Sequence, residues 1–216
     1  MAMSGYFGIV LQILLGSIFS LSGGVEEGIT QSKRIDMDSK VYEIALKGIN
    51  AIQDSLHEKI KYLAVVDFSL PSTSKRFYLI DLTDTSLVCS EYVCHGKQSG
   101  ENYATSFSNT VHSYKSSLGF YRLSESYIGQ HGLSIRMDGL DKGYNDNARE
   151  RAIVMHAADY ADTSVIQMWG RLGRSHGCPA LPKETFSSIA SIIENNTIIF
   201  HYYPDEKYLK ESVWLR

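Results

Sequence analysis

The spacing of the apolar residues changes near residue 60, and this change is the strongest constraint on the fold. Before it, a segment that begins at Asp38 or Ser39 and runs to about Glu58 has apolar residues three and four positions apart, the period of one helix face. After it, short apolar segments alternate with turns rich in Gly, Ser, Asn and Pro, which is typical of strands. The 14 Tyr and 17 Gly also favour β structure. We therefore predict a mostly-β domain preceded by a helix.

The part of the chain after residue 60 is predicted to contain seven strands and a second helix. The strands are expected at residues 61–68, 76–82, 87–93, 119–124, 133–137, 151–156 and 197–203. The helix is expected to begin at Pro182 and to end at about Glu194. No internal repeat or linker interrupts residues 60–204, so we expect one main domain. The predicted division is an N-terminal segment (1–24), a helical arm (25–60), the main domain (61–204) and a C-terminal tail (205–216).

The first 24 residues have features of a targeting segment. An apolar run from Tyr6 to Leu21 is followed by small residues, as at a signal-peptidase site. The run is slightly short for a membrane span, and Met1 to Gly5 contain no Lys or Arg. An export signal, an uncleaved anchor and a buried helix all remain open. An export signal predicts a protein of the periplasm or cell envelope, whose N-terminal segment contacts the membrane before processing.

The charge of the chain gives little support to a nucleic-acid partner. The formal net charge is -3, and the Lys and Arg residues are scattered along the sequence. Phosphate backbones are usually bound by a clustered basic excess. We therefore expect no nucleic-acid partner.

The chain has three cysteines, so at least one is left without a disulfide in an oxidising compartment. Cys89 and Cys94 are five positions apart along one predicted strand, a separation of roughly 16 Å with side chains on opposite faces. A disulfide needs Cα atoms within about 7 Å. We expect both to be buried or half-buried thiols that are not bridged to each other.

The third cysteine, Cys178, lies in a segment suited to acyl transfer. A thiol is a nucleophile only as the thiolate, so it needs a base or a positive charge nearby. His176 is two residues away, and His156 ends a predicted strand that can direct it at a loop. Arg174 adds a positive charge that could lower the thiol pKa or bind a substrate carboxylate. Gly177 would let a substrate approach the backbone, where the N–H groups of Gly177 and Cys178 could bind an oxyanion.

Two other interpretations of these residues stay open at this point. A cysteine near a histidine is often purely structural. His156, His176 and Cys178 could also supply three zinc ligands, although their spacing lacks the paired C-x-x-C pattern and no fourth ligand stands out. The residues alone thus indicate a candidate cysteine acyl-transfer enzyme and nothing narrower.

Ser175-His176-Gly177-Cys178, with His156 nineteen positions before Ser175, resembles the active-site signature of YkuD-type L,D-transpeptidases. The wider sequence is similar to one branch, the murein L,D-transpeptidase catalytic domain family, over residues 60–204. The matching segments are 67–69, 71–72, 75–82, 95–97, 99–100, 104–109, 114–121, 138–140, 145–149 and 170–182. The resemblance implies a β-sandwich-like catalytic domain at 61–204, with a helical arm before it and one helix after the catalytic cysteine.

The sequence departs from the broader family at one place. Pro179 and Ala180 follow the cysteine, where an apolar residue and then Asn are usual. The particular branch accepts Pro-Ala. It also often carries an aromatic or amide residue at the position of His176, which favours His156 as the base.

The resemblance implies a role for each residue of the signature. Cys178 would be the acylated nucleophile and His156 its general base, with the backbone carbonyl of Ala157 orienting the ring. His176, Gly177 and Cys178 would form the oxyanion site, and Ser175 would brace the loop by hydrogen bonding. No metal or organic cofactor is implied. His95, His112 and His131 are expected to be surface or structural residues.

The implied substrates are the stem peptides of peptidoglycan. Cys178 would attack a tetrapeptide, release D-alanine and pass the acyl group to an acceptor. A stem amine would give a 3-3 cross-link, a protein lysine would anchor a protein to the wall, and water would make the enzyme an L,D-carboxypeptidase. The alternatives are a non-catalytic peptidoglycan-binding module and a cysteine hydrolase of another amide. A pure binder would need neither His156 nor Cys178.

Overall fold

The computed structural model describes residues 35–195 and 197–216. Eight strands form one mixed sheet in the order β3-β2-β1-β8-β4-β5-β6-β7. The strands are β1 (Tyr62–Asp67), β2 (Phe77–Asp81), β3 (Ser86–Glu91), β4 (Gly119–Gly129), β5 (Gly132–Gly139), β6 (Val154–Ala157), β7 (Ala180–Leu181) and β8 (Thr197–Tyr202). The helices are α1 (Ser39–Leu56), the 3-10 turn η1 (Asp159–Ala161), α2 (Thr163–Trp169), α3 (Lys183–Ile193) and α4 (Glu206–Glu211). The prediction of a mostly-β domain is confirmed.

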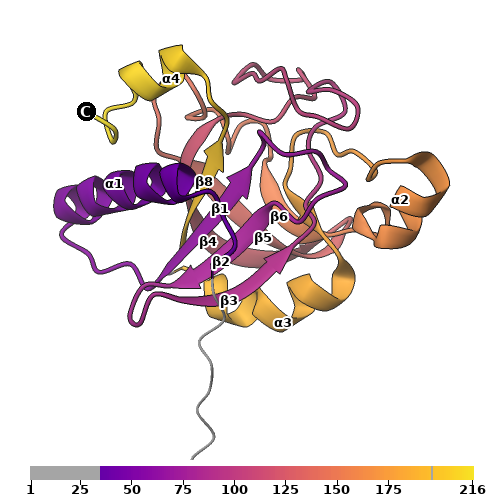
Figure 1. Cartoon of the computed structure of the whole chain (residues 1–216), viewed down its shortest axis with the longest axis horizontal. Helices are drawn as coiled ribbons and strands as arrows, with labels where there is room; N and C mark the ends of the chain where they lie inside the picture. The colour runs from indigo at the N-terminus through magenta and orange to yellow at the C-terminus, as the bar shows by residue number, and fades with distance from the viewer. Residues whose placement is uncertain (1–34, 196) are drawn as a thin grey trace, which may run out of the picture. The chain divides into compact units, whose positions relative to one another are not determined.

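Helix α1 begins and ends where its sequence allows. The carboxylate of Asp38 accepts hydrogen bonds from the N–H groups of Lys40 and Val41, at 2.8 and 3.4 Å, and so caps the first turn. His57 ends the helix in the left-handed conformation. One face is buried and packs on β1 and β8 (Figure 1). The predicted helix is therefore part of the core.

The centre of the sheet is closed on both faces. β1 and β8 pair in parallel, and every residue of both strands is buried. Such uninterrupted burial is expected of parallel strands, which usually lie between two layers. Phe120 of β4 and Phe200 of β8 are paired in register, and their rings stack with centroids 4.2 Å apart. The core therefore holds β8 and β4 rigidly beside each other.

One end of the sheet carries His156 on β6 and adjoins the loop that holds Cys178, just before β7. β6 pairs antiparallel with β5, where His156 is opposite Ser134, and parallel with β7, where His156 is opposite Ala180. Parallel neighbours need a crossover connection, and here it contains η1 and α2. The pairing places the chain just after Cys178 beside His156.

Several elements differ from the prediction. α2, α4 and β7 were not predicted, and β4 extends to Gly129, well beyond its expected end at residue 124, whereas β5 begins at Gly132, close to its expected start. The segment expected as a C-terminal tail contains α4 and buries Tyr208 completely. Cys94 is buried beyond the end of β3, and Cys89 is half-buried on it.

The predictions for residues 1–24, and for the start of the arm, lie outside the described residues. Among the residues that are described, no helix combines the length and the apolar character needed to cross a membrane.

Candidate active site

Cys178 and His156 share one cavity. It has a volume of about 160 Å³, and its lining comes from the β4–β5 turn, β6, η1 and the loop before β7. The lining residues are His131, His156, Tyr160, Arg174, Ser175, His176 and Cys178. The fold thus brings together the nucleophile and the base that the sequence suggested.

His156 is held in one tautomer. Its Nδ1 lies 2.9 Å from the carbonyl oxygen of Ala157. Because a carbonyl oxygen can only accept, Nδ1 must carry the proton, which leaves Nε2 as the basic nitrogen. The side chain is buried, and this burial lowers the pKa of His156, with the charge of His131 acting in the same direction. Ala157 therefore lies where an orienting carbonyl is needed.

Cys178 is half-buried, and its thiol contacts the carbonyl oxygen of Ala152 at 3.8 Å. Burial raises the pKa of the thiol, while backbone hydrogen bonds from Val154 and Cys178 and the positive charge of Arg151 act in the opposite direction. A thiol with a raised pKa is protonated at neutral pH. It consequently needs a base such as His156 before it can attack a carbonyl.

Ser175 braces the loop that carries Cys178. Its hydroxyl donates to the carbonyl oxygen of Cys178 at 2.7 Å and accepts from the N–H of Gly177 at 3.0 Å. Its own N–H donates to the carbonyl oxygen of His95 at 2.9 Å. The residue is buried. The hydroxyl therefore closes a small ring that fixes the backbone around Cys178.

Gly177 and His176 have different surroundings. Gly177 has φ +130°, and a Cβ atom there would lie 2.8 Å from the carbonyl oxygen of Lys115. Because the N–H of Gly177 donates to Ser175, it is engaged inside the loop.

His176 is exposed, with Nε2 3.2 Å from Nζ of Lys97 and its ring centroid 4.7 Å from that of Tyr114. Three N–H groups were expected to bind an oxyanion, those of His176, Gly177 and Cys178. Ser175 accepts a hydrogen bond from the N–H of Gly177, which leaves the N–H groups of His176 and Cys178 as the candidate donors.

Arg174 lines the cavity, but its charge is engaged elsewhere. Its guanidinium donates to the carboxylate of Glu101 at 2.6 Å and to the carbonyl oxygens of Lys97 and Gly100 at 3.2 and 3.0 Å. The arginine whose charge acts on the thiol is Arg151 instead.

Arg151 was missed as a site residue, although the sequence places it at the start of the segment that ends in His156. It donates to the hydroxyl of Ser117 at 2.8 Å and also to the carbonyl oxygen of Lys115. Ser116, between them, donates to the carbonyl oxygen of Gly177 at 3.2 Å. Arg151 therefore fixes the segment against which the loop that carries Cys178 packs.

His131 was expected to be a surface or structural histidine. It is exposed, but its ring stacks on that of His156, with centroids 4.4 Å apart and an interplanar angle of 20°. No short-range motif could reveal this contact, because the two histidines are 25 positions apart.

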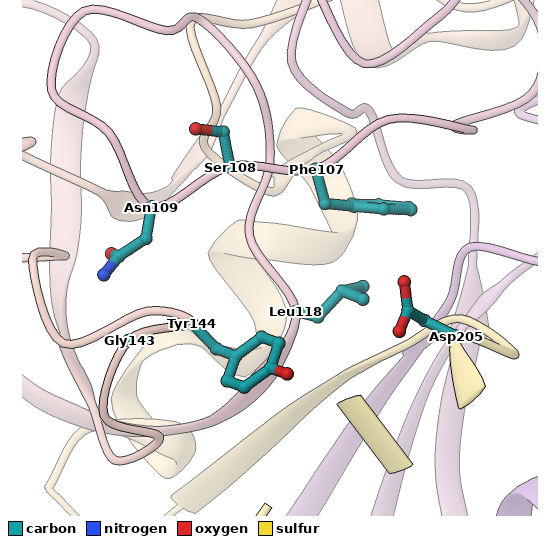
Figure 2. Close-up of a pocket in the computed structure, with 7 residues that line it drawn as sticks. All are labelled: Phe107, Ser108, Asn109, Leu118, Gly143, Tyr144 and Asp205. Atoms are coloured by element: carbon teal, nitrogen blue, oxygen red, sulfur yellow. The ribbon is translucent and has the colours of Figure 1, made fainter. Parts of the chain in front are cut away.

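A second cavity, of about 220 Å³, is shown in Figure 2. Its lining residues are Phe107, Ser108, Asn109, Leu118, Gly143, Tyr144 and Asp205. None of these seven described residues is a cysteine or histidine. The amide of Asn109 donates to Asp146 at 2.7 Å, and the hydroxyl of Tyr144 donates to Glu211 at 2.6 Å.

Within residues 35–195 and 197–216, no three His, Cys, Asp or Glu side chains converge as metal ligands.

Comparison with solved structures finds similar chains at low identity. An L,D-transpeptidase from Mycobacterium smegmatis is 13% identical with a TM-score of 0.43, over 67% of this chain and 59% of that one. L,D-transpeptidase 3 from Mycobacterium tuberculosis, in complex with a faropenem-derived adduct, is 11% identical with a TM-score of 0.43, over 67% and 61%. A protein of Bdellovibrio bacteriovorus is 17% identical with a TM-score of 0.42, over 67% and 48%. The chain thus spans less than two thirds of the length of these proteins.

No match was found among curated proteins. The family model described as L,D-transpeptidase catalytic domain matches residues 33–202, which is most of the chain and contains both His156 and Cys178. The chain therefore belongs to the L,D-transpeptidase catalytic domain family.

Proposed function

We propose that the protein is a peptidoglycan L,D-transpeptidase that uses Cys178 as its nucleophile. The observation that carries the proposal is the hydrogen bond of 2.9 Å between Nδ1 of His156 and the carbonyl oxygen of Ala157, in the cavity that Cys178 also lines. This bond leaves Nε2 available as a base for the thiol. A wall substrate implies that the protein works outside the cytoplasm, in the periplasm or cell envelope.

The proposed first half-reaction acylates the thiol. The proton of Cys178 moves to Nε2 of His156, and the thiolate attacks the carbonyl carbon between the third stem residue, a diamino acid, and D-alanine. The N–H groups of His176 and Cys178 stabilise the oxyanion. The C–N bond then breaks, His156 returns its proton to the leaving amine, and D-alanine departs. The stem peptide remains attached as a thioester.

In the second half-reaction an acceptor attacks the thioester. His156 takes a proton from the acceptor, the C–S bond breaks, and the thiolate of Cys178 leaves and is reprotonated. An amine of a second stem peptide gives a 3-3 cross-link, and a protein amine gives a wall-anchored protein. Water gives a tripeptide and makes the enzyme an L,D-carboxypeptidase. The same thioester serves all three acceptors.

The experiment that tests the proposal uses a disaccharide-tetrapeptide as donor. The protein and the Cys178→Ala variant are incubated with it, intact protein mass is recorded, and the products are separated by chromatography. We expect an acyl adduct and released D-alanine with the wild-type protein, and neither with the variant. A dimer or a tripeptide among the products identifies the acceptor.

Two outcomes would contradict the proposal. Release of D-alanine that persists in Cys178→Ala would remove the cysteine from the mechanism. Binding of the donor without adduct or D-alanine would make the protein a peptidoglycan-binding module instead. A β-lactam that acylates thiols provides a second probe, because its adduct on Cys178 needs no acceptor.

A further inference from the structure

His131 is placed against the proposed base by the β4–β5 hairpin. The last pair of this hairpin is Gly129 with Gly132, so His131 lies in its turn. Gly132 has φ +74°, a conformation that suits glycine in such a turn. Two residues later, Ser134 pairs with His156 across β5 and β6. The hairpin therefore supports the backbone of His156 and also supplies the ring that covers its imidazole.

The contact between the two rings has the geometry of a stack. The centroids are 4.4 Å apart and the planes differ by 20°, while Tyr160 meets the imidazole of His156 edge-on at 6.4 Å. His131 remains exposed, whereas His156 is only 1% exposed. A residue that itself faces solvent therefore covers one face of the proposed base.

We infer that His131 is a positioning residue, which stacks on His156 and holds the imidazole in the orientation that lets Nε2 serve Cys178. The inference rests on the proposed role of His156 as the base. The hydrogen bond from Nδ1 to Ala157 fixes one point of the ring but still permits the ring to tilt about that point. A stacked ring restricts the tilt, because a rotated imidazole would lose its contact with His131.

The groups around the two rings determine how removal of His131 should change the pKa of His156. Arg174, His176 and Cys178 share the cavity of His156, and Asp159 and Lys183 line the adjoining cavity beside His131, where they form an ion pair at 2.5 Å. Burial is the larger cause that lowers the pKa of His156, and the charge of His131 is a smaller one. Without His131 both causes weaken, so the pKa of His156 should rise toward its ordinary value.

The experiment compares His131→Ala, His131→Phe and Gln130→Ala with the wild-type chain. Phe keeps an aromatic ring for the stack, and Gln130 occupies the same turn but lines only the adjoining cavity of the two. The titration of His156 is followed by NMR, and the alkylation of Cys178 by iodoacetamide is followed by peptide mass at neutral pH. Neither readout needs a peptidoglycan substrate.

In His131→Ala we expect His156 to titrate at higher pH and alkylation to slow by up to about a hundredfold, the loss that a misplacement of roughly 1 Å can produce. His131→Phe should restore the rate and most of the low titration, because it keeps the burial of His156 but not the smaller effect of the His131 charge. Gln130→Ala should resemble the wild type. The inference is overturned if His131→Ala titrates and reacts like the wild type, or if His131→Phe fails to restore the alkylation rate. A protein that passes this test but releases no D-alanine would overturn the proposed function while leaving the positioning role intact.

Discussion

The hydroxyl of Ser175 donates a hydrogen bond of 2.7 Å to the carbonyl oxygen of Cys178, three residues further along the chain. The same hydroxyl accepts from the N–H of Gly177. Ser175→Ala would leave both backbone groups without this partner in a buried place, which costs about 1–3 kcal/mol of unfolding free energy. We expect slower acylation of Cys178 and an earlier urea transition. Ser175→Thr keeps the hydroxyl and should be closer to the wild type; equal losses in both variants would contradict the bracing role.

Gly177 should tolerate no side chain, because both its backbone conformation and the space around it exclude one. A comparison with Gly143 separates these two effects. Its φ of +130° is unfavourable for other residues, and a Cβ atom would lie 2.8 Å from the carbonyl oxygen of Lys115. Gly143 also has a positive φ, +82°, but a Cβ atom there would meet nothing within 4 Å. Gly177→Ala should therefore cost more stability than Gly143→Ala, and it alone should abolish acylation. Thermal unfolding measures the stability of each variant, and intact protein mass measures its acylation. Equal stability costs in the two variants would show that the clash at Gly177 is relieved.

Arg151, rather than Arg174, should control the ionisation of the Cys178 thiol. The positive charge of Arg151 lowers the pKa of Cys178 against the larger effect of burial, so Arg151→Gln should raise that pKa. The pH dependence of Cys178 alkylation would then move to higher pH. Arg151→Lys keeps the charge and should move it less, although it loses the hydrogen bond to Ser117.

Arg174→Gln is the matched control, because the guanidinium of Arg174 is paired with Glu101. It should leave the alkylation midpoint close to that of the wild type. A larger shift in Arg174→Gln than in Arg151→Gln would restore the role in thiol activation that the sequence first suggested for Arg174.

The protein should lose stability in moderately acidic solution. Burial lowers the pKa of both His95 and His201 to about 4. Between the ordinary histidine pKa of about 6.5 and this value, the unfolded chain binds more protons than the folded one, so unfolding becomes easier as the pH falls. The expected loss is roughly 2–3 kcal/mol for each histidine across this window.

Urea unfolding at several pH values between 7 and 4 tests this expectation. His201→Asn removes one of the two titrating groups and should make the loss with falling pH smaller, whatever its effect at neutral pH. A wild-type stability that stays constant over this range, or an unchanged slope in His201→Asn, would show that the buried histidines are not responsible.

The sequence was sufficient to predict the elements whose apolar pattern repeats over many residues or whose residues are all buried. α1 presents one apolar face over eighteen residues, and β8 is buried along its whole length, so both were predicted close to their observed bounds. α2 was missed because it is short and leaves Met168 and Trp169 exposed, so no apolar face repeats. β7 has two residues and becomes a strand only through its pairing with β6.

The same distinction holds for the site. Cys178 and His156 were predicted because each belongs to a recognisable local pattern. The contacts of Arg151 and His131 with this pair depend on how the β4–β5 hairpin and the start of β6 are placed in space. The engagement of Arg174 by Glu101 was likewise hidden, since an arginine beside a cysteine in sequence can direct its charge away from it.

The short parallel pairing of β6 with β7 should make this part of the sheet open before the rest of the protein unfolds. Only two residue pairs, His156 with Ala180 and Ala157 with Leu181, join these strands, whereas β1 and β8 share six. Segments with few backbone pairings open at lower free energy than the core. Acylation of Cys178 that depends on His156 should therefore be lost at a denaturant concentration at which the rest of the sheet is still intact, so that loss of activity would precede global unfolding and would not result from it.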